Sequence, residues 1–233
     1  MYHSITFGVK NTWADWHLIP SSRPVFTPPP FKSKLIDIPG INGMLDLSTL
    51  FTNGEPTYGN RVGSFEFIVV NDFLSWDVAY SNIMNYLHGR NLQLILEDDP
   101  DWTYQGRFTI NEWRSDKNYS LIVIDYSVQP YKQELFSSIQ DWEWDSFSFD
   151  TGLIQELASI VVNNTTITVI GRPKQVYLGI TSSVIMNVVI NGVTKTLAVG
   201  LNLLPGVSLI EGNNTLVFAG SGTVSINYRG GSL

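Results

Sequence analysis

The sequence predicts a mainly β protein with two domains, the first of which carries a single helix. Short runs of β-branched and aromatic residues, separated by turn residues, recur along the chain. One stretch, Phe73–Leu87, instead has the spacing of an amphipathic helix. The composition also changes sharply near residue 150. The 233 residues are enough for two domains that each bury a core.

The change near residue 150 affects both aromatic content and charge. Nineteen acidic and ten basic residues precede it, whereas two acidic and four basic residues follow, so the two parts carry −9 and +2 of the total −7. All seven Trp residues also precede it: Trp13, Trp16, Trp76, Trp102, Trp113, Trp142 and Trp144. A shift of this kind indicates a domain boundary between Pro130–Lys132 and Thr151–Gly152. We therefore expect domains at 1–140 and 141–233.

Alternating or continuous apolar runs predict the strands of the first domain. They are Ser4–Phe7, Leu35–Ile38, Met44–Leu47, Ser64–Val70, Leu92–Leu96, Thr103–Ile110 and Ser120–Val128. In the predicted helix, Asn71 or Asp72 is placed to cap the N-terminus and Gly89 follows the end. Its apolar stripe is expected at Leu74, Val78, Ile83 and Leu87. We expect this helix to pack across the sheet.

A Pro-rich stretch separates the first strand from the next. Consecutive prolines fix φ and remove hydrogen-bond donors, so the segment should be extended and lie outside a sheet. Two interpretations stay open at this stage, a simple surface arm and an arm that reaches a neighbouring subunit. The candidate inter-subunit arm comprises Pro20, Pro24, Phe26, Pro28, Pro29, Pro30 and Phe31.

The second domain is predicted to be nearly all β. Trp142–Phe149 alternates bulky and polar residues, which is typical of a half-buried strand. Asn191–Gly192 lies between the apolar runs Val188–Ile190 and Val193–Leu197, which predicts a hairpin with a type I′ turn. Turn residues recur about every ten positions, a spacing typical of a β-sandwich or jelly roll.

Residue types that carry out chemistry are scarce, and we predict no catalytic, cofactor-binding or metal-binding residue. The absence of Cys excludes disulfides and thiolate chemistry, and His3, His17 and His88 are scattered without a metal-binding spacing. Glu97, Asp98, Asp99 and Asp101 are the densest carboxylate cluster. A calcium site or an acid/base pair is conceivable there, but the cluster lacks the Gly and the distal Glu of a calcium loop. Asp and Pro form turns, so a hairpin turn is favoured.

Charge and hydropathy narrow the classes of partner. The net charge of −7 disfavours binding to nucleic acid through phosphate neutralisation. No apolar run approaches the roughly 18 residues needed to span a bilayer, and no signal peptide is evident. We therefore expect a soluble protein made in a cytoplasm, without membrane insertion.

A series of short motifs occurs in the first domain in a defined order. The series is Tyr58–Arg61 leading into Phe65–Phe67, then Tyr86–Gly89, Leu94–Trp102, Tyr104–Phe108 and Tyr126–Lys132. In this order the motifs resemble the distal tail protein family of siphophages, the long non-contractile-tailed phages of Gram-positive bacteria. The ending Val224–Gly231 is similar to the close of such proteins. The rest of the second domain resembles them only in general character.

The resemblance implies a ring adaptor of a phage tail tip rather than an enzyme. It implies an N-terminal β-sandwich or split-barrel domain that forms a hexameric ring, and a galectin-like C-terminal β-sandwich. The ring would join the major tail protein to the tail-associated tip protein. DNA would pass through the central channel without specific binding, and the second domain would dock receptor-binding or baseplate proteins. The implied location is the virion, at the tail tip.

Two alternatives belong to other functional classes. A carbohydrate-binding β-sandwich module would stack a sugar on aromatic rings, but residues 151–233 contain no Trp and offer only Tyr177 and Tyr228. A glycosidase would need two of the clustered carboxylates to converge about 5–10 Å apart across a cleft. The position of the aromatic rings tests the sugar-binding alternative, and the convergence of two carboxylates in a cleft tests the glycosidase alternative.

Overall fold

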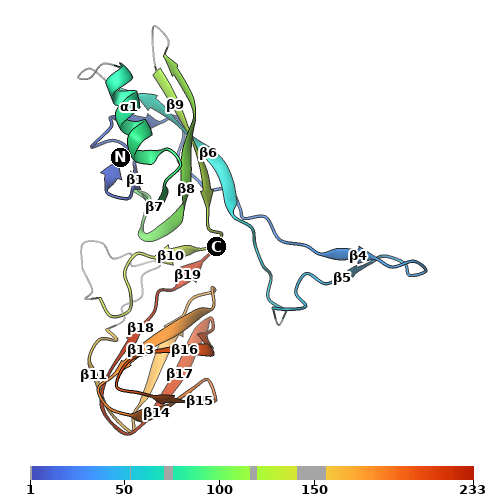
Figure 1. Ribbon diagram of the computed structural model, residues 1–233, viewed down its shortest axis with the longest axis vertical. Helices are drawn as coiled ribbons and strands as arrows, with labels where there is room; N and C mark the ends of the chain where they lie inside the picture. Colours follow the sequence, from blue (N-terminus) through green and yellow to red (C-terminus); the bar gives the residue numbers. More distant parts are fainter. Residues whose placement is uncertain (1, 53, 71–75, 116–119, 141–155) are drawn as a thin grey trace. The chain divides into compact units, whose positions relative to one another are not determined.

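A computed structural model describes residues 2–52, 54–70, 76–115, 120–140 and 156–233. The chain forms two compact units, shown in Figure 1. The first contains Met1–Asp98 and Tyr104–Pro130, and the second contains Asp99–Thr103 and Tyr131–Leu233. The chain passes from the first unit to the second between residues 130 and 131, at the start of the window for the domain boundary expected from composition. The short stretch Asp99–Thr103 belongs to the second unit, although the residues on both sides of it belong to the first. Composition did not indicate this.

Counting charges by unit removes the predicted asymmetry. The first unit has 12 acidic and nine basic residues, or −3, and the second has nine acidic and five basic residues, or −4. The difference arises because Asp99, Asp101 and the acidic stretch 131–150 fall in the second unit. The value of −9 therefore describes a part of the sequence and not a folded unit.

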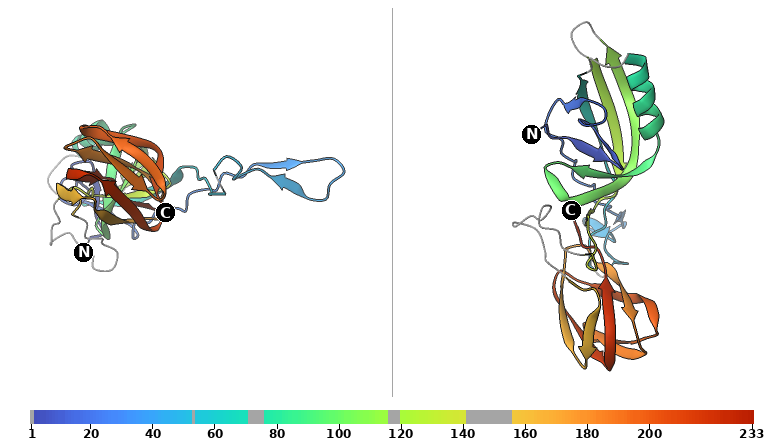
Figure 2. Two further views of the ribbon diagram at one scale, coloured as in Figure 1. Left: turned by 90° about the horizontal axis from the view of Figure 1, so that it is seen from below. Right: turned by 90° about the vertical axis from the view of Figure 1, so that its left-hand side faces the viewer.

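The first unit is built on a curled sheet with the strand order β2-β1-β7-β8-β9-β6-β3 (Figures 1 and 2). The strands are β1 (Ile5–Phe7), β2 (Lys10–Asn11), β3 (Leu18–Pro20), β6 (Arg61–Val69), β7 (Asn91–Leu96), β8 (Asp99–Ser115) and β9 (Ser120–Val128). Alternation places Phe65, Phe67 and Val69 of β6 in the core and leaves Val62 and Ile68 exposed. The sequence prediction of Ser120–Val128 matches β9 at both ends.

The helix α1 (Trp76–Leu87) packs on this sheet with a stripe different from the predicted one. Ala79, Ile83 and Leu87 are buried, and the last two belong to the sheet core, whereas Val78 is 45% exposed. Residues four apart lie on one helix face, which groups Ala79, Ile83 and Leu87. Val78 precedes Ile83 by five residues and lies off this face, so the prediction that Val78 belongs to the buried stripe was wrong. Leu74 and the two proposed caps lie outside the described residues. Gly89 ends the helix with φ 75° and donates its N–H to the Phe108 carbonyl at 2.7 Å.

The predicted turn at Glu97–Asp101 is shorter than expected. Only Glu97 and Asp98 form the turn, and β8 begins at Asp99. Trp102 and Thr103 pair with Glu134 and Gln133 of β10 (Lys132–Glu134). This tertiary pairing overrides the turn propensity of Asp and Pro.

The second unit is a β-sandwich, as predicted. Its two four-stranded sheets have the orders β11-β18-β13-β16 and β12-β17-β14-β15. The strands are β11 (Ile160–Asn163), β12 (Thr166–Gly171), β13 (Val176–Ser182), β14 (Met186–Ile190), β15 (Val193–Leu197), β16 (Gly200–Leu209), β17 (Gly212–Ala219) and β18 (Ser221–Asn227). Both sheets contribute to one core, which includes Ile180, Leu209, Phe218 and Ile226. The predicted strand Trp142–Phe149 lies outside the described residues.

The hairpin between β14 and β15 confirms the type I′ prediction. Asn191 and Gly192 both have positive φ, 47° and 86°, and β14 pairs with β15 directly on either side. Asn191 tolerates this conformation better than most residues, and Gly192 has no Cβ to oppose it.

A cluster around Trp102 holds Asp99–Thr103 in the second unit. The indole is 4% exposed and lies between two cations, with Lys132 Nζ at 4.6 Å and Arg172 Cζ at 5.2 Å from the ring centroid. Lys132 pairs with Asp99 and Arg172 pairs with Glu134, each at 2.6 Å. Glu134 also accepts the N–H of Gly230, which precedes β19 (Gly231–Ser232), the strand on the other side of β10. Cation–π contacts of this kind contribute about 0.5–2 kcal/mol each.

We predict that Gly171→Ala destabilises the second unit by more than about 2 kcal/mol, because a Cβ at Gly171 would collide with the Ile210 carbonyl. The control is Gly179→Ala, whose Cβ would make ordinary contacts of 3.5 Å or more. Differential scanning calorimetry of the full chain measures both. Equal melting temperatures for the two variants would contradict the close approach at Gly171.

Candidate interaction surfaces

The first half of the predicted arm lies on its own unit. Pro20 belongs to the edge strand β3 and pairs with Phe67 of β6, and Pro24 is buried. Phe26 packs on three rings of the core, with centroid distances of 4.0 Å to Tyr104, 4.8 Å to Tyr126 and 5.3 Å to Phe65. Proline at a sheet edge avoids the loss of a ladder hydrogen bond, which allows Pro20 this position.

Polar contacts fix the segment just after Phe26. The Thr27 N–H donates to the Tyr126 hydroxyl at 3.1 Å, and Arg61 donates to the carbonyl oxygens of Thr27 and Pro130 at 3.1 and 2.8 Å. Gly63 makes room for the Tyr126 hydroxyl, which a Cβ at that position would strike. Pro20–Thr27 is therefore part of the domain.

The projecting arm begins where the predicted arm ends. Pro28, Pro29 and Pro30 lead to Phe31, which forms an isolated β-bridge with Tyr58. The Lys32 N–H donates to Thr57, and the Gly59 N–H donates to Pro30, closing the base of the loop. We call residues 31–58 the hairpin arm. Its strands β4 (Leu35–Asp37) and β5 (Met44–Asp46) pair, among the described strands, only with each other, and Figure 1 shows the arm extending from its unit.

The hairpin arm exposes large apolar side chains along its length. Every residue of β4 and β5 is exposed, and Phe51 reaches 90% exposure. The set is Phe31, Leu35, Ile36, Ile41, Met44, Leu45, Leu50 and Phe51. A two-stranded hairpin is marginally stable by itself in water. Covering each of these side chains completely would contribute roughly 1.5–3 kcal/mol, so contact with another surface would stabilise the arm.

Three of the four clustered carboxylates, Glu97, Asp98 and Asp99, make separate contacts. Glu97 accepts the Ser4 N–H at 2.6 Å, Asp98 lies 2.9 Å from His3 and 2.8 Å from Arg23, and Asp99 pairs with Lys132. Burial raises the pKa of Asp98, but the hydrogen bonds from His3 and Arg23 outweigh it and hold that pKa below its ordinary value. These carboxylates serve separate structural contacts.

The three histidines also lie in separate surroundings. His3 faces Asp98, His17 stacks edge-on with Trp13, and His88 accepts the Ile110 N–H at 3.1 Å. Within the described residues, no group of three or more His, Asp or Glu side chains is placed to hold a metal ion. No helix in the same part of the chain is long and apolar enough to cross a membrane.

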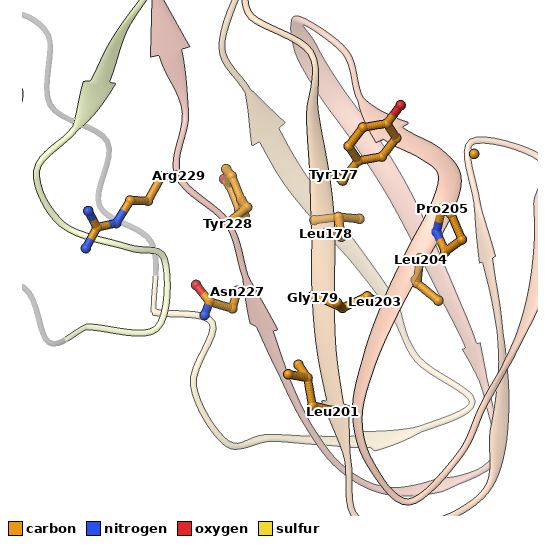
Figure 3. Close-up of a pocket in the computed structure, with 11 residues that line it drawn as sticks. Tyr177, Leu178, Gly179, Leu201, Leu203, Leu204, Pro205, Asn227, Tyr228 and Arg229 are labelled. Atoms are coloured by element: carbon orange, nitrogen blue, oxygen red, sulfur yellow. The ribbon is translucent and has the colours of Figure 1, made fainter. Parts of the chain in front are cut away.

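The second unit carries an open groove of about 980 Å³ over strands β13, β16 and β18 (Figure 3). Its exposed apolar side chains are Tyr177, Leu201 and Leu203, which are 71%, 66% and 74% exposed. Asn227 and Arg229 come from the opposite side of the groove. Sequence patterns missed this groove because it depends on which strands of a sandwich are neighbours.

Only one of the two tyrosines considered for sugar stacking presents its ring. Tyr228 is 4% exposed and donates its hydroxyl to the Ile170 carbonyl at 2.9 Å. Of the two, only Tyr177 has an exposed ring on which a sugar could stack, and the exposed Leu201 and Leu203 line the same groove. A single Tyr beside apolar side chains offers a sugar less stacking area than a Trp platform does.

Comparison by sequence finds no relative: no family model matches the chain, and no curated protein does. Comparison by structure finds the crystal structure of the Dit protein (gp 19.1) of phage SPP1, described as a paradigm of the hub of the adsorption apparatus in phages that infect Gram-positive bacteria. The two are 14% identical in sequence, with a TM-score of 0.62 and coverage of 99% of each chain.

The chain shares its fold with SPP1 Dit. The similarity extends over both units, which confirms at the level of the fold the resemblance to distal tail proteins that the ordered motifs predicted.

The two halves of the Pro-rich segment should respond differently to mutation. We predict that Phe26→Ala lowers the free energy of unfolding by about 2–3 kcal/mol, because it removes a ring that packs on the core. Phe31→Ala should cost less than about 1 kcal/mol, because that side chain is 47% exposed. Urea denaturation at low protein concentration measures both, since association contributes least there. The reverse order would show that Phe31 is the anchored residue.

Proposed function

We propose that this chain is a structural subunit of a phage tail tip, a ring adaptor that joins the tail tube to the tip. The observation that carries the proposal is the similarity to an adsorption-apparatus hub protein over 99% of both chains. A carbohydrate-binding module would account for the sandwich of the second unit, but it would leave the first unit and its hairpin arm unexplained.

The hairpin arm supports assembly from several copies. A closed ring needs a heterologous interface, in which one surface of a subunit meets a different surface of the next. The arm supplies one such surface, with eight large exposed apolar side chains. In this proposal the inter-subunit contact is made by residues 31–58, and the Pro-rich segment before them anchors the arm.

The proposal includes six copies around a channel through which DNA passes. The major tail protein and a tail-associated tip protein would contact the two sides of the ring, and the second unit would dock receptor-binding or baseplate proteins. The first unit carries −3, so repulsion within the ring is weaker than the −9 of residues 1–150 suggested. An overall negative charge keeps DNA from adhering to the channel. In this proposal the protein lies in the virion, at the tail tip.

The full chain should sediment as a ring with a mass near six times 26.1 kDa, about 157 kDa. Because apolar contacts hold the ring and screening weakens only the repulsion, we expect assembly to strengthen with added salt. The double variant Ile41→Asp, Phe51→Asp should yield monomers, since it places charge in the covered arm. Analytical ultracentrifugation from 0.05 to about 1 M NaCl measures this.

The matched control is Val161→Asp, which changes a side chain of 78% exposure in the second unit. It should assemble like the unmodified chain. A monomeric unmodified chain, or a ring that dissociates as salt rises, would contradict the proposed assembly.

A further inference from the structure

The tripeptide Ile-Asn-Gly occurs twice in the sequence, in two different structural settings. Ile41–Gly43 lies in the loop between β4 and β5, at the far end of the hairpin arm in Figure 1, and Ile190–Gly192 contains the type I′ turn between β14 and β15. An asparagine followed by glycine is especially open to deamidation, because glycine has no Cβ to hinder attack by its backbone nitrogen. Both asparagines are exposed. Since the local sequence is the same, tertiary contacts decide how fast each of them reacts.

Hydrogen bonds hold the Asn191 side chain against β17. Its Oδ1 accepts the Thr215 N–H at 3.2 Å, and its Nδ2 donates to Asn214 Oδ1 at 2.8 Å. The backbone N–H of Asn191 also donates to the Thr215 carbonyl, at 3.1 Å. Cyclisation requires the side-chain Cγ to turn toward the next backbone nitrogen, which would break both side-chain bonds. Reaction at Asn191 therefore requires local opening of the hairpin.

The side chain that receives Asn191 is itself fixed. Asn214 is fully buried, accepts the Ile210 N–H at 2.9 Å, and donates to the carbonyls of Ile210 and Gly212 at 2.8 and 2.9 Å. Asn202 closes the preceding turn with the same kinds of bonds, but none of its printed bonds reaches Asn191. The chain therefore offers a matched pair of buried amide contacts, of which one supports Asn191.

Asn42 lacks this support. Within the part of the chain that the structure describes, no hydrogen bond holds its side chain. The pairing of β4 with β5 ends at Asp37 and Met44, so Asn42 can turn toward the Gly43 nitrogen without losing a bond of the strand ladder. Open space surrounds Gly43, where an added Cβ would meet no atom within 4 Å. The barrier that the fold imposes at Asn191 is absent at Asn42.

We propose that Asn42 is a deamidation site of the free subunit and that the fold protects Asn191 from the same reaction. The Gly43 backbone nitrogen attacks Cγ of Asn42. The new N–Cγ bond replaces the Cγ–Nδ2 bond, and the side-chain nitrogen leaves as ammonia with the proton of the Gly43 N–H. Water then opens the five-membered succinimide to aspartate or isoaspartate at position 42.

The modification adds a negative charge to an apolar part of the hairpin arm. Ile41 and Met44, on either side of the Asn-Gly pair, are each 62% exposed. Burial of a carboxylate without a partner is costly, so a deamidated arm should no longer be covered by a neighbouring subunit. This consequence rests on the proposed function, whereas the reaction depends only on the exposed loop.

The test is mass-spectrometric peptide mapping during incubation of the full chain at mildly alkaline pH. The double variant Leu50→Asp, Phe51→Asp keeps Ile41–Gly43 intact and places charge in the arm, so it represents the free subunit. In this variant Asn42 should deamidate roughly tenfold faster than Asn191, or more. Synthetic peptides of residues 37–46 and 186–195 should react at similar rates, because they share the tripeptide. Peptide mapping also separates Asn42 from the third Asn-Gly pair, which begins at residue 53, outside the described residues.

The matched variants test the protection of Asn191. Asn214→Ser should accelerate its deamidation about fivefold or more, and Asn202→Ser by less than about twofold, because only Asn214 contacts Asn191. Circular dichroism checks that both variants fold. The comparison of Asn42 with Asn191 in the arm variant decides the proposal even if a Ser variant does not fold.

Equal deamidation rates at Asn42 and Asn191 in the arm variant would overturn the proposal. So would a folded Asn214→Ser chain in which Asn191 reacts no faster than in the Asn202→Ser chain. Slower reaction at Asn42 in the assembled unmodified chain than in the arm variant would support both the site and the covered arm. A chain that stays monomeric and still deamidates rapidly at Asn42 would refute the ring and leave the modification site standing.

Discussion

The long strand β8 is shared by two folded units, and the organisation of the chain depends on this sharing. Its first five residues, Asp99–Thr103, pair with β10 in the second unit, and its remainder lies at the centre of the first unit's sheet. The burial of Trp102 between Lys132 and Arg172 holds the first part in place. The second unit is thus completed by residues that precede its main segment by about 30 positions in the sequence, and neither unit is a continuous piece of chain.

Each unit has its own hydrophobic core, and each also exposes large apolar side chains outside that core. In the first unit, alternation fills the core from β6, β8 and β9, while the hairpin arm contributes nothing to that core. In the second, both sheets fill one core, while Leu201 and Leu203 remain on the outer face of an edge strand. Apolar side chains gathered along one projecting segment, as in the hairpin arm, are characteristic of association. The His and carboxylate side chains of the described residues, by contrast, are scattered and make separate contacts.

Local patterns predicted those elements whose partners are close in sequence. The strand Ser120–Val128 alternates cleanly and was predicted with both ends correct. The Asn191–Gly192 turn needs two positive φ values, which those residue types supply without tertiary help. The helix was located correctly, but its buried stripe was displaced. Val78 is more apolar than Ala79, and only the position of the sheet decides that Ala79 faces inward.

The Pro-rich segment shows why the candidate surfaces could be predicted only in part. Proline chemistry predicted that the whole segment lies outside a sheet, which was wrong at Pro20, because an edge strand accepts proline. Phe26 and Phe31 look alike in the sequence, and only the folded structure shows that Phe26 packs on Tyr104 and Tyr126. The exposed strands β4 and β5 were predicted as strands. No local sequence pattern, however, indicates that they pair only with each other and join no larger sheet. The groove likewise joins residues from β13, β16 and β18, which are far apart in the sequence.

The sequence by itself determined the mainly β class, the change of character near residue 150, several element bounds and the resemblance to distal tail proteins. These follow from periodicity, turn chemistry and motif order, which act over a few residues or along the chain in sequence. Tertiary structure alone decided the exchange of Asp99–Thr103, the anchoring of Phe26, the freedom of the hairpin arm and the groove at Arg229. Each of these depends on which distant segments pack together. Burial and strand pairing across the whole fold select those segments, and no local pattern in the sequence contains that information.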